Sequence, residues 1–154
     1  RHAVGAHGAE FAAGTGPRPG LKCRRMKFCS DCAAPLIEAT PAGDDRPRRV
    51  CSNCGQIHYR NPVVVVGCLV ERGDEVLLCR RAIEPVKGRW TLPAGYLELG
   101  ETLIAGARRE TKEEAAAEVH VTGPLSYLDL VHIGQMHATF RARLVGDDYG
   151  PGPE

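Results

Sequence analysis

Two closely spaced cysteine pairs restrict how this chain can fold more than any other feature does. Each pair has two residues between its thiols, and 18 residues separate the pairs: Cys29 and Cys32, then Cys51 and Cys54. Two intervening residues let one tight turn present both sulfurs to a single ion, and two such turns complete a tetrahedron. Because protein atoms fill all four positions, the spacing predicts a structural zinc ion in a zinc ribbon. Four unrelated thiols or a redox pair are the alternative.

The remaining cysteines carry no such pattern. The chain has seven cysteines, an odd number that favours a metal site over a disulfide framework. Cys23, Cys68 and Cys79 are predicted to be one surface thiol and two small core residues.

The first 28 residues differ from the rest in charge. They hold six basic residues and one acidic residue, a net charge of +5, whereas the remaining residues hold 14 basic against 18 acidic, a net charge of −4. Residues 1–25 show no hydrophobic period and are therefore predicted to be a disordered presequence. Their basic, acid-poor composition is typical of a transit peptide to a chloroplast or another organelle, although they lack serine. A flexible tail on a cytoplasmic protein is the alternative.

Residues 26–60 are predicted to form the ribbon, with a turn at residues 41–47 between two short strands. Residues 61–154 change in composition and are predicted to form an α/β domain. Its first part reads as a strand, a second strand in a hairpin, a glycine-bearing loop and a helix, at residues 63–69, 75–80, 84–100 and 102–117. Its second part reads as three strands separated by turns at Gly123-Pro124 and Ile133-Gly134, at residues 118–122, 125–131 and 136–145.

Three carboxylates share one face of the predicted helix. Glu110, Glu113 and Glu114 are related as i, i+3 and i+4, which places them within about 100° of one another around the helix axis. Carboxylates held together repel, and an oxygen-seeking divalent cation relieves that repulsion. Mg²⁺ is the expected ion, with Mn²⁺ as the alternative. A glutamate run by itself is more often a solvated face, so the surrounding residues decide its meaning. Four residues of the neighbouring arc are predicted to pack on a sheet: Ile104, Ala107, Thr111 and Ala115.

The surrounding residues complete a longer pattern. The spacing G-x5-E-x7-R-E-x-x-E-E is made by Gly95, Glu101, Arg109, Glu110, Glu113 and Glu114. It resembles the box of the Nudix hydrolases. Together with the four cysteines, the motifs at residues 61–62, 66–68, 77–81 and 88–96 resemble the branch that carries an N-terminal zinc ribbon, which includes bacterial proteins and plant plastid enzymes similar to FAD pyrophosphatases. The resemblance implies a Nudix-type α/β/α sandwich with a mixed sheet, incomplete at the C-terminus.

The chain departs from the family pattern at several positions. Thr111 and Ala117 stand where the box has aliphatic residues, and Ala116 stands where it has glycine. Residues 128–135 lack the proline-rich run that follows the box in NADH pyrophosphatases, and the proline expected in many ADP-ribose pyrophosphatases is missing near Val131 and His132. The metal carboxylates are intact, so these departures bear on packing and specificity more than on chemistry.

The resemblance also implies residue roles. Glu110, Glu113 and Glu114 would hold Mg²⁺ with the carbonyl of Ala94, and Glu110 or Glu113 would help to deprotonate the attacking water. Arg109 would pair with Glu101 and hold the loop against the helix; a surface ion pair is the alternative. Three loop residues are substrate-binding candidates, with loop anchoring as the alternative for the two aromatic residues: Trp90, Gly95 and Tyr96.

The function implied is Mg²⁺-dependent hydrolysis of the pyrophosphate bond of FAD or a related adenosine dinucleotide, which gives AMP and a second phosphate product. ADP-ribose or NADH pyrophosphatase activity is the alternative within the class. A catalytically idle ribbon that binds nucleic acid or protein through basic residues is the alternative of another class: Arg46, Arg48, Arg49 and Arg60. The net charge of +1 argues against general nucleic-acid binding, no apolar stretch is long enough for a membrane span, and a homodimer remains open.

Overall fold

The computed structural model describes residues 26–84 and 86–152. The predicted presequence at residues 1–25, with Cys23, lies outside the described residues. The chain divides between His58 and Tyr59 into two compact units. Among the described residues, no helix has both the length and the apolar character that crossing a membrane requires.

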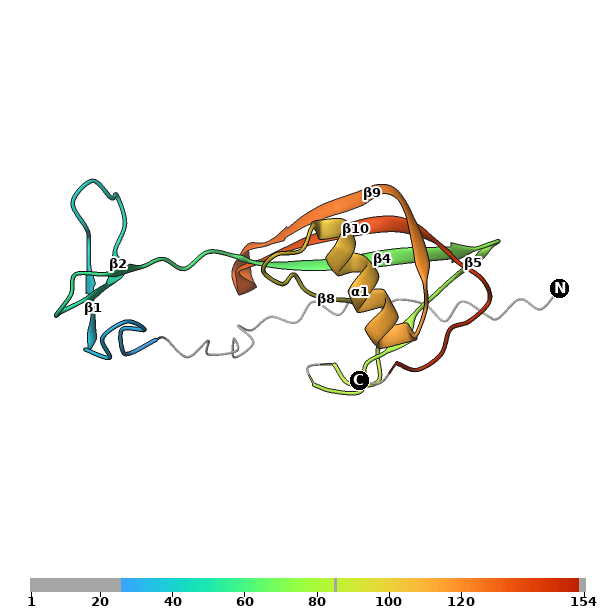
Figure 1. Ribbon diagram of the computed structural model, residues 1–154, viewed down its shortest axis with the longest axis horizontal. Helices are drawn as coiled ribbons and strands as arrows, with labels where there is room; N and C mark the ends of the chain where they lie inside the picture. Colours follow the sequence, from blue (N-terminus) through green and yellow to red (C-terminus); the bar gives the residue numbers. More distant parts are fainter. Residues whose placement is uncertain (1–25, 85, 153–154) are drawn as a thin grey trace, which may run out of the picture. The chain divides into compact units, whose positions relative to one another are not determined.

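The first unit is a small antiparallel sheet beside the cysteines. Its strands are β1 (Leu36–Ala39), β2 (Arg48–Cys51) and β3 (Ile57–His58), in the order β1-β2-β3 (Figure 1). The predicted turn between two short strands is confirmed, and an Arg48–Asp44 ion pair of 2.8 Å closes it. Among the described residues of this unit, the buried apolar core consists of Cys29, Leu36 and Cys51. A core of this size stabilises a fold weakly, so we expect a bound metal to contribute.

The second unit is built on a mixed sheet, as predicted. The strand order is β5-β4-β10-β9, and β8 also pairs with β4. The strands are β4 (Val63–Arg72), β5 (Glu75–Val76), β8 (Ala94–Tyr96), β9 (Val119–Leu130) and β10 (Gln135–Leu144). β4 and β10 are parallel, and the other pairs are antiparallel.

One helix covers one face of this sheet (Figure 1). α1 (Leu103–Ala115) begins at Thr102, whose Oγ1 accepts the N–H of Ala105 at 3.1 Å, and is followed by Ala116 in the left-handed region. The core packs α1 against β4 and β10: Val66, Cys68, Val70, Ala107, Ala138, Phe140 and Ala142. The second helical layer of the predicted sandwich is not found among the described residues.

The packing face of the helix was predicted correctly at three positions of four. Ala107, Thr111 and Ala115 are buried, but Ile104 is 46% exposed and was wrongly assigned to the sheet. The unusual Thr111 is accommodated because its hydroxyl donates to the carbonyl of Ala107 at 2.7 Å. A buried hydroxyl that is hydrogen-bonded carries little penalty, so this departure does not disrupt the helix.

Two strand predictions were wrong in their bounds. The strand expected at residues 75–80 divides into β5 and β6 (Cys79–Arg80), and β6 pairs with β7 (Trp90–Thr91) in a separate two-stranded sheet. The turn expected at Gly123-Pro124 is absent, because β9 runs through it with two irregularities in its pairing to β10. β9 pairs only with β10 among the described residues, and a proline is tolerated in such an edge strand beside a bulge. Cys68 is buried and Cys79 is half-buried, as predicted for small core residues.

Candidate active site

The face of α1 that meets β8 carries Glu110, which is only 8% exposed. Gly95 lies in β8 opposite Val66 of β4, on the side of the sheet that α1 covers. A Cβ atom added at Gly95 would overlap the carboxyl group of Glu110. The glycine is therefore required by the close approach of a carboxylate to the strand, which explains its place in the pattern.

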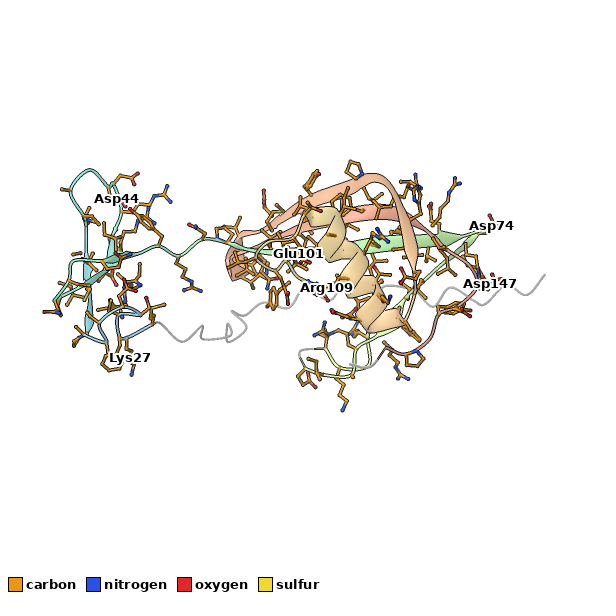
Figure 2. All side chains as sticks on the ribbon, in the orientation of Figure 1. Lys27, Asp44, Asp74, Glu101, Arg109 and Asp147 are labelled. Atoms are coloured by element: carbon orange, nitrogen blue, oxygen red, sulfur yellow. The ribbon has the colours of Figure 1, made fainter. Side chains whose placement is uncertain are left out.

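Arg109 joins the loop to the helix. Its Nε and Nη2 donate to the two carboxylate oxygens of Glu101 at 3.1 and 2.8 Å, and Nη2 also donates to the carbonyl of Tyr96 at 3.0 Å. Figure 2 shows Glu101 and Arg109 close together beside the helix. Hydrogen bonding from Arg109 lowers the pKa of the Glu101 carboxyl, and pairing with Glu101 raises that of the guanidinium. The predicted pair is thus a bidentate clamp with a further backbone contact.

The same guanidinium reaches two of the helix carboxylates. Nη1 donates to Oε1 of Glu110 and to Oε2 of Glu113, both at 2.8 Å. Sequence reasoning paired Arg109 with Glu101 alone and missed these two contacts. All five guanidinium contacts use the planar fork of arginine, which a lysine ammonium cannot reproduce.

Glu114 is positioned by the backbone of β8, whereas Arg109 contacts Glu110 and Glu113. Its Oε2 accepts the backbone N–H of Ala94 at 3.1 Å, so the strand positions this carboxylate directly. The structure therefore places Ala94 beside Glu114 through its N–H group, and metal coordination by its carbonyl stays a prediction. The four carboxylates and Arg109 carry a formal charge of −3, which favours a cation at this site. Carboxylate oxygens are the donors that Mg²⁺ prefers, so these residues are of the type that suits a divalent ion. In this structure no three of the four carboxylates offer oxygens that all lie within 4.8 Å of one another, so metal binding by them stays a prediction.

Two glycines that sequence reasoning did not single out also shape the site. A Cβ atom at Gly106 would lie 2.6 Å from Oε1 of Glu101, and one at Gly67 would lie 2.5 Å from the carbonyl oxygen of Pro93. Gly106 could have been found from the sequence. A glycine inside a helix lowers helix stability by about 1 kcal/mol relative to alanine, so its presence there indicates a packing reason such as a close approach.

The two aromatic candidates lie in different environments. Trp90 is 65% exposed and lines an open cavity of about 340 Å³ with Val76, Leu77, Leu78 and Tyr149. Tyr96 pairs with Val65, one residue away from the Gly95–Val66 pair, so its ring projects from the opposite face of the sheet to α1. Its hydroxyl contacts Nε2 of Gln135 at 3.3 Å. Tyr96 is not among the residues that line the cavity of Trp90, so their substrate roles stay separate predictions.

The four paired cysteines converge as their spacing predicts. Their ligand atoms all lie within 4.8 Å of one another, and among the described residues no other group of three or more acidic, histidine or cysteine side chains does so. The two cysteine turns have the same hydrogen bond. The backbone N–H of Ala33 donates to the carbonyl of Cys29, and that of Gly55 donates to the carbonyl of Cys51. Backbone N–H groups of Cys54 and Asn53 lower the pKa of the Cys51 thiol to about 6, which favours the thiolate that zinc requires.

The basic residues of the ribbon are largely engaged within it. Arg48 forms a two-bond pair with Asp44, and Nη2 of Arg49 donates to the carbonyl of Met26 at 3.1 Å. Arg46 lies 3.6 Å from Asp45 with both side chains exposed. Two of the four basic residues, Arg46 and Arg48, thus lie beside acids, which reduces the positive potential there and weakens the hypothesis of a nucleic-acid-binding ribbon.

This fold and loop–helix geometry are those of a Nudix domain, preceded by a zinc-ribbon module. The model of the NUDIX domain matches residues 61–147, and the Nudix N-terminal zinc-ribbon model matches residues 27–60. The chain therefore belongs to the Nudix hydrolase family, whose members use a divalent metal. The comparisons do not show the predicted resemblance to plant plastid enzymes.

Relatives with assigned activities match parts of the chain. An NAD-capped RNA hydrolase NudC of Chromobacterium violaceum is 38% identical over 93 residues, 60% of this chain and 33% of that protein. An ADP-ribose pyrophosphatase of Methanocaldococcus jannaschii is 41% identical over 56 residues, 36% of this chain and 33% of that protein. The chain thus spans about a third of the length of each. A crystal structure of a NUDIX hydrolase from Nitrosomonas europaea is 50% identical, with a TM-score of 0.81 over 84% of this chain and 73% of that one.

Replacing Gly95 with alanine tests the close approach of Glu110. We expect Gly95→Ala to lower the turnover number for hydrolysis of the pyrophosphate bond of a nucleotide substrate about 10²-fold, because the new Cβ atom displaces the carboxylate of Glu110. Gly123→Ala in β9 is the matched control, since a Cβ atom there meets nothing within 4 Å. Steady-state kinetics of the two variants compare the sites, and equal turnover in both would contradict the assignment.

Proposed function

We propose that this chain catalyses Mg²⁺-dependent hydrolysis of the pyrophosphate bond in an adenosine diphosphate derivative, releasing AMP and a second phosphate product. The observation that carries the proposal is the single Arg109 guanidinium that holds Glu101, Glu110 and Glu113 in one arrangement. A clamp of this kind gives the carboxylates the fixed geometry that phosphoryl chemistry needs.

The roles of the residues follow from their contacts. A bound divalent ion lowers the pKa of water and neutralises charge on phosphoryl oxygens. Glu110, Glu113 and Glu114 are proposed to hold that ion. The side chain of Glu113 is 37% exposed and that of Glu110 is 10% exposed, so of these two Glu113 is better placed to take a proton from a water molecule at the surface. Arg109 and the N–H of Ala94 orient the carboxylates from two sides.

FAD is the first proposed substrate, on the sequence resemblance to FAD pyrophosphatases. The relatives support a wider class, because FAD, NAD and ADP-ribose share an adenosine diphosphate group. The missing proline-rich run after residue 128 argues against NADH as the preferred member. NAD-capped RNA enters as a second candidate because of the NudC relatives.

The test is a substrate panel with the full chain. FAD, ADP-ribose, NADH and an NAD-capped RNA are each incubated with Mg²⁺, and released AMP, or 5′-monophosphate RNA, is measured by chromatography. We expect AMP from at least one dinucleotide, and omission of the metal should abolish it. Absence of product from every compound, with a folded and zinc-loaded protein, would contradict the proposal; product from the capped RNA alone would assign the second candidate.

A further inference from the structure

His58 is a residue of the ribbon that the cysteine pattern does not include. It is the last residue of β3, where it pairs with Arg49 of β2, and it is half-buried. Its Nε2 lies 3.4 Å from Sγ of Cys29, the most N-terminal of the four sulfurs. The neighbouring backbone fixes this approach, because β3 pairs with the strand that ends in Cys51.

The sulfurs of the two cysteine pairs differ in their backbone partners. Sγ of Cys51 accepts two backbone N–H groups, from Asn53 and Cys54, both at 3.4 Å. Sγ of Cys29, at the equivalent place in the first pair, accepts one described backbone N–H, from Asp31, at 3.4 Å. The imidazole of His58 is a further partner of this sulfur, at the same distance of 3.4 Å.

A second donor matters because of the charge that the site would carry. Four thiolates around one Zn²⁺ ion have a net formal charge of −2, and N–H groups directed at the sulfurs stabilise that charge. Cys29 is buried, so its thiolate has little help from water. A zinc-bound thiolate has no proton to give, so the hydrogen bond requires the N–H on Nε2 of His58.

His58 does not fit the role of a ligand. Only the four sulfurs form the group of ligand atoms that lie within 4.8 Å of one another, and His58 contacts Cys29 alone among them. Four thiolates already complete the tetrahedron that structural zinc adopts.

We propose that His58 is a positioning residue of the zinc site, donating a hydrogen bond from Nε2 to the Cys29 thiolate and thereby slowing the loss of zinc from the ribbon. Outer-shell partners of this kind typically change metal affinity by about 10- to 100-fold.

The experiment compares three variants of the full chain by the rate at which a coloured chelator removes zinc. His58→Phe keeps a ring and removes the donor, whereas His58→Gln keeps an N–H group at a similar reach. Gln56→Ala is the control, since its exposed side chain is changed while its backbone is kept. We expect zinc release about 10-fold faster for His58→Phe and close to the parent rate for His58→Gln and Gln56→Ala.

Cobalt substitution separates positioning from ligation. We expect the same four-thiolate absorption spectrum in the parent chain and in both His58 variants. Equal release from His58→Phe and the parent would overturn the proposal, and so would equally fast release from His58→Phe and His58→Gln, because packing would then explain the effect. A cobalt spectrum that changes in His58→Phe would show His58 to be a ligand. Each readout is independent of nucleotide hydrolysis, so failure here leaves the proposed function untouched.

Discussion

Glu113→Gln should lower the turnover number for AMP release by about 10²- to 10⁴-fold, the range expected when a group that transfers protons is lost. The substitution removes one charge and one acceptor from a partly exposed side chain. Arg109 keeps its contacts to Glu101, Glu110 and the Tyr96 carbonyl, so we expect the variant to keep the parent fold. The expected shift in melting temperature is below about 4 °C, which corresponds to about 1 kcal/mol in a domain of this size.

Glu118→Gln is the matched control. This residue follows the same helix, is exposed, and pairs with Lys112 rather than with the active-site residues. Its variant should keep parent kinetics. Glu114→Gln, which can still accept the N–H of Ala94 through its amide oxygen, should fold and lose activity with Glu113→Gln. Parent turnover in both active-site variants would contradict the assignment of Glu113 and Glu114 to the active site.

Arg109→Lys should lower the turnover number about 10²-fold although it keeps the positive charge. A lysine ammonium cannot reach the oxygens of Glu101, Glu110, Glu113 and Tyr96 together, so the loop and the helix lose their common support. Small misplacements of catalytic groups carry rate losses of about this size. Arg109→Ala should in addition destabilise the unit by about 3 kcal/mol, because the buried Glu110 then lies beside other carboxylates without its cation.

Arg108→Ala is the control for this second prediction. Arg108 is the preceding residue on the same helix and is exposed, so its removal should change neither turnover nor melting temperature appreciably. Both Arg109 variants are measured by steady-state kinetics and thermal unfolding. A turnover in Arg109→Lys equal to that of Arg108→Ala would show that charge alone is needed and that the fork geometry is not.

Local signals predicted much of the fold. The helix was predicted at residues 102–117 and lies at Leu103–Ala115, because alanine-rich composition and a Thr102 cap act within a few residues of each other. The strand bounds failed where distant pairing decided them. β6 leaves the hairpin because it pairs with β7 across the loop, and β9 passes through Gly123-Pro124 because β10 supports it on one side.

The candidate site shows the same division. The identities of Glu101, Arg109 and the helix glutamates were readable, because their spacing is a property of one loop and one helix. The separation of Trp90 from Tyr96 was not, since it depends on which face of β8 meets α1. The approach of His58 to Cys29 was also hidden, because 29 positions separate them and only the β2–β3 pairing brings them together.

The sequence by itself determined which side chains are available to hold metal and the local turns or helix that present them, because four thiols in two tight turns and carboxylates at i, i+3 and i+4 are short-range geometry. Only the tertiary structure decided how those groups are held. The parallel pairing of β4 with β10 and the packing of α1 on one face of the sheet join segments far apart in the chain. The contact of Arg109 with the carbonyl of Tyr96 then joins the helix to the strand before it. Such contacts depend on the burial of apolar surface between whole elements, which no local spacing encodes.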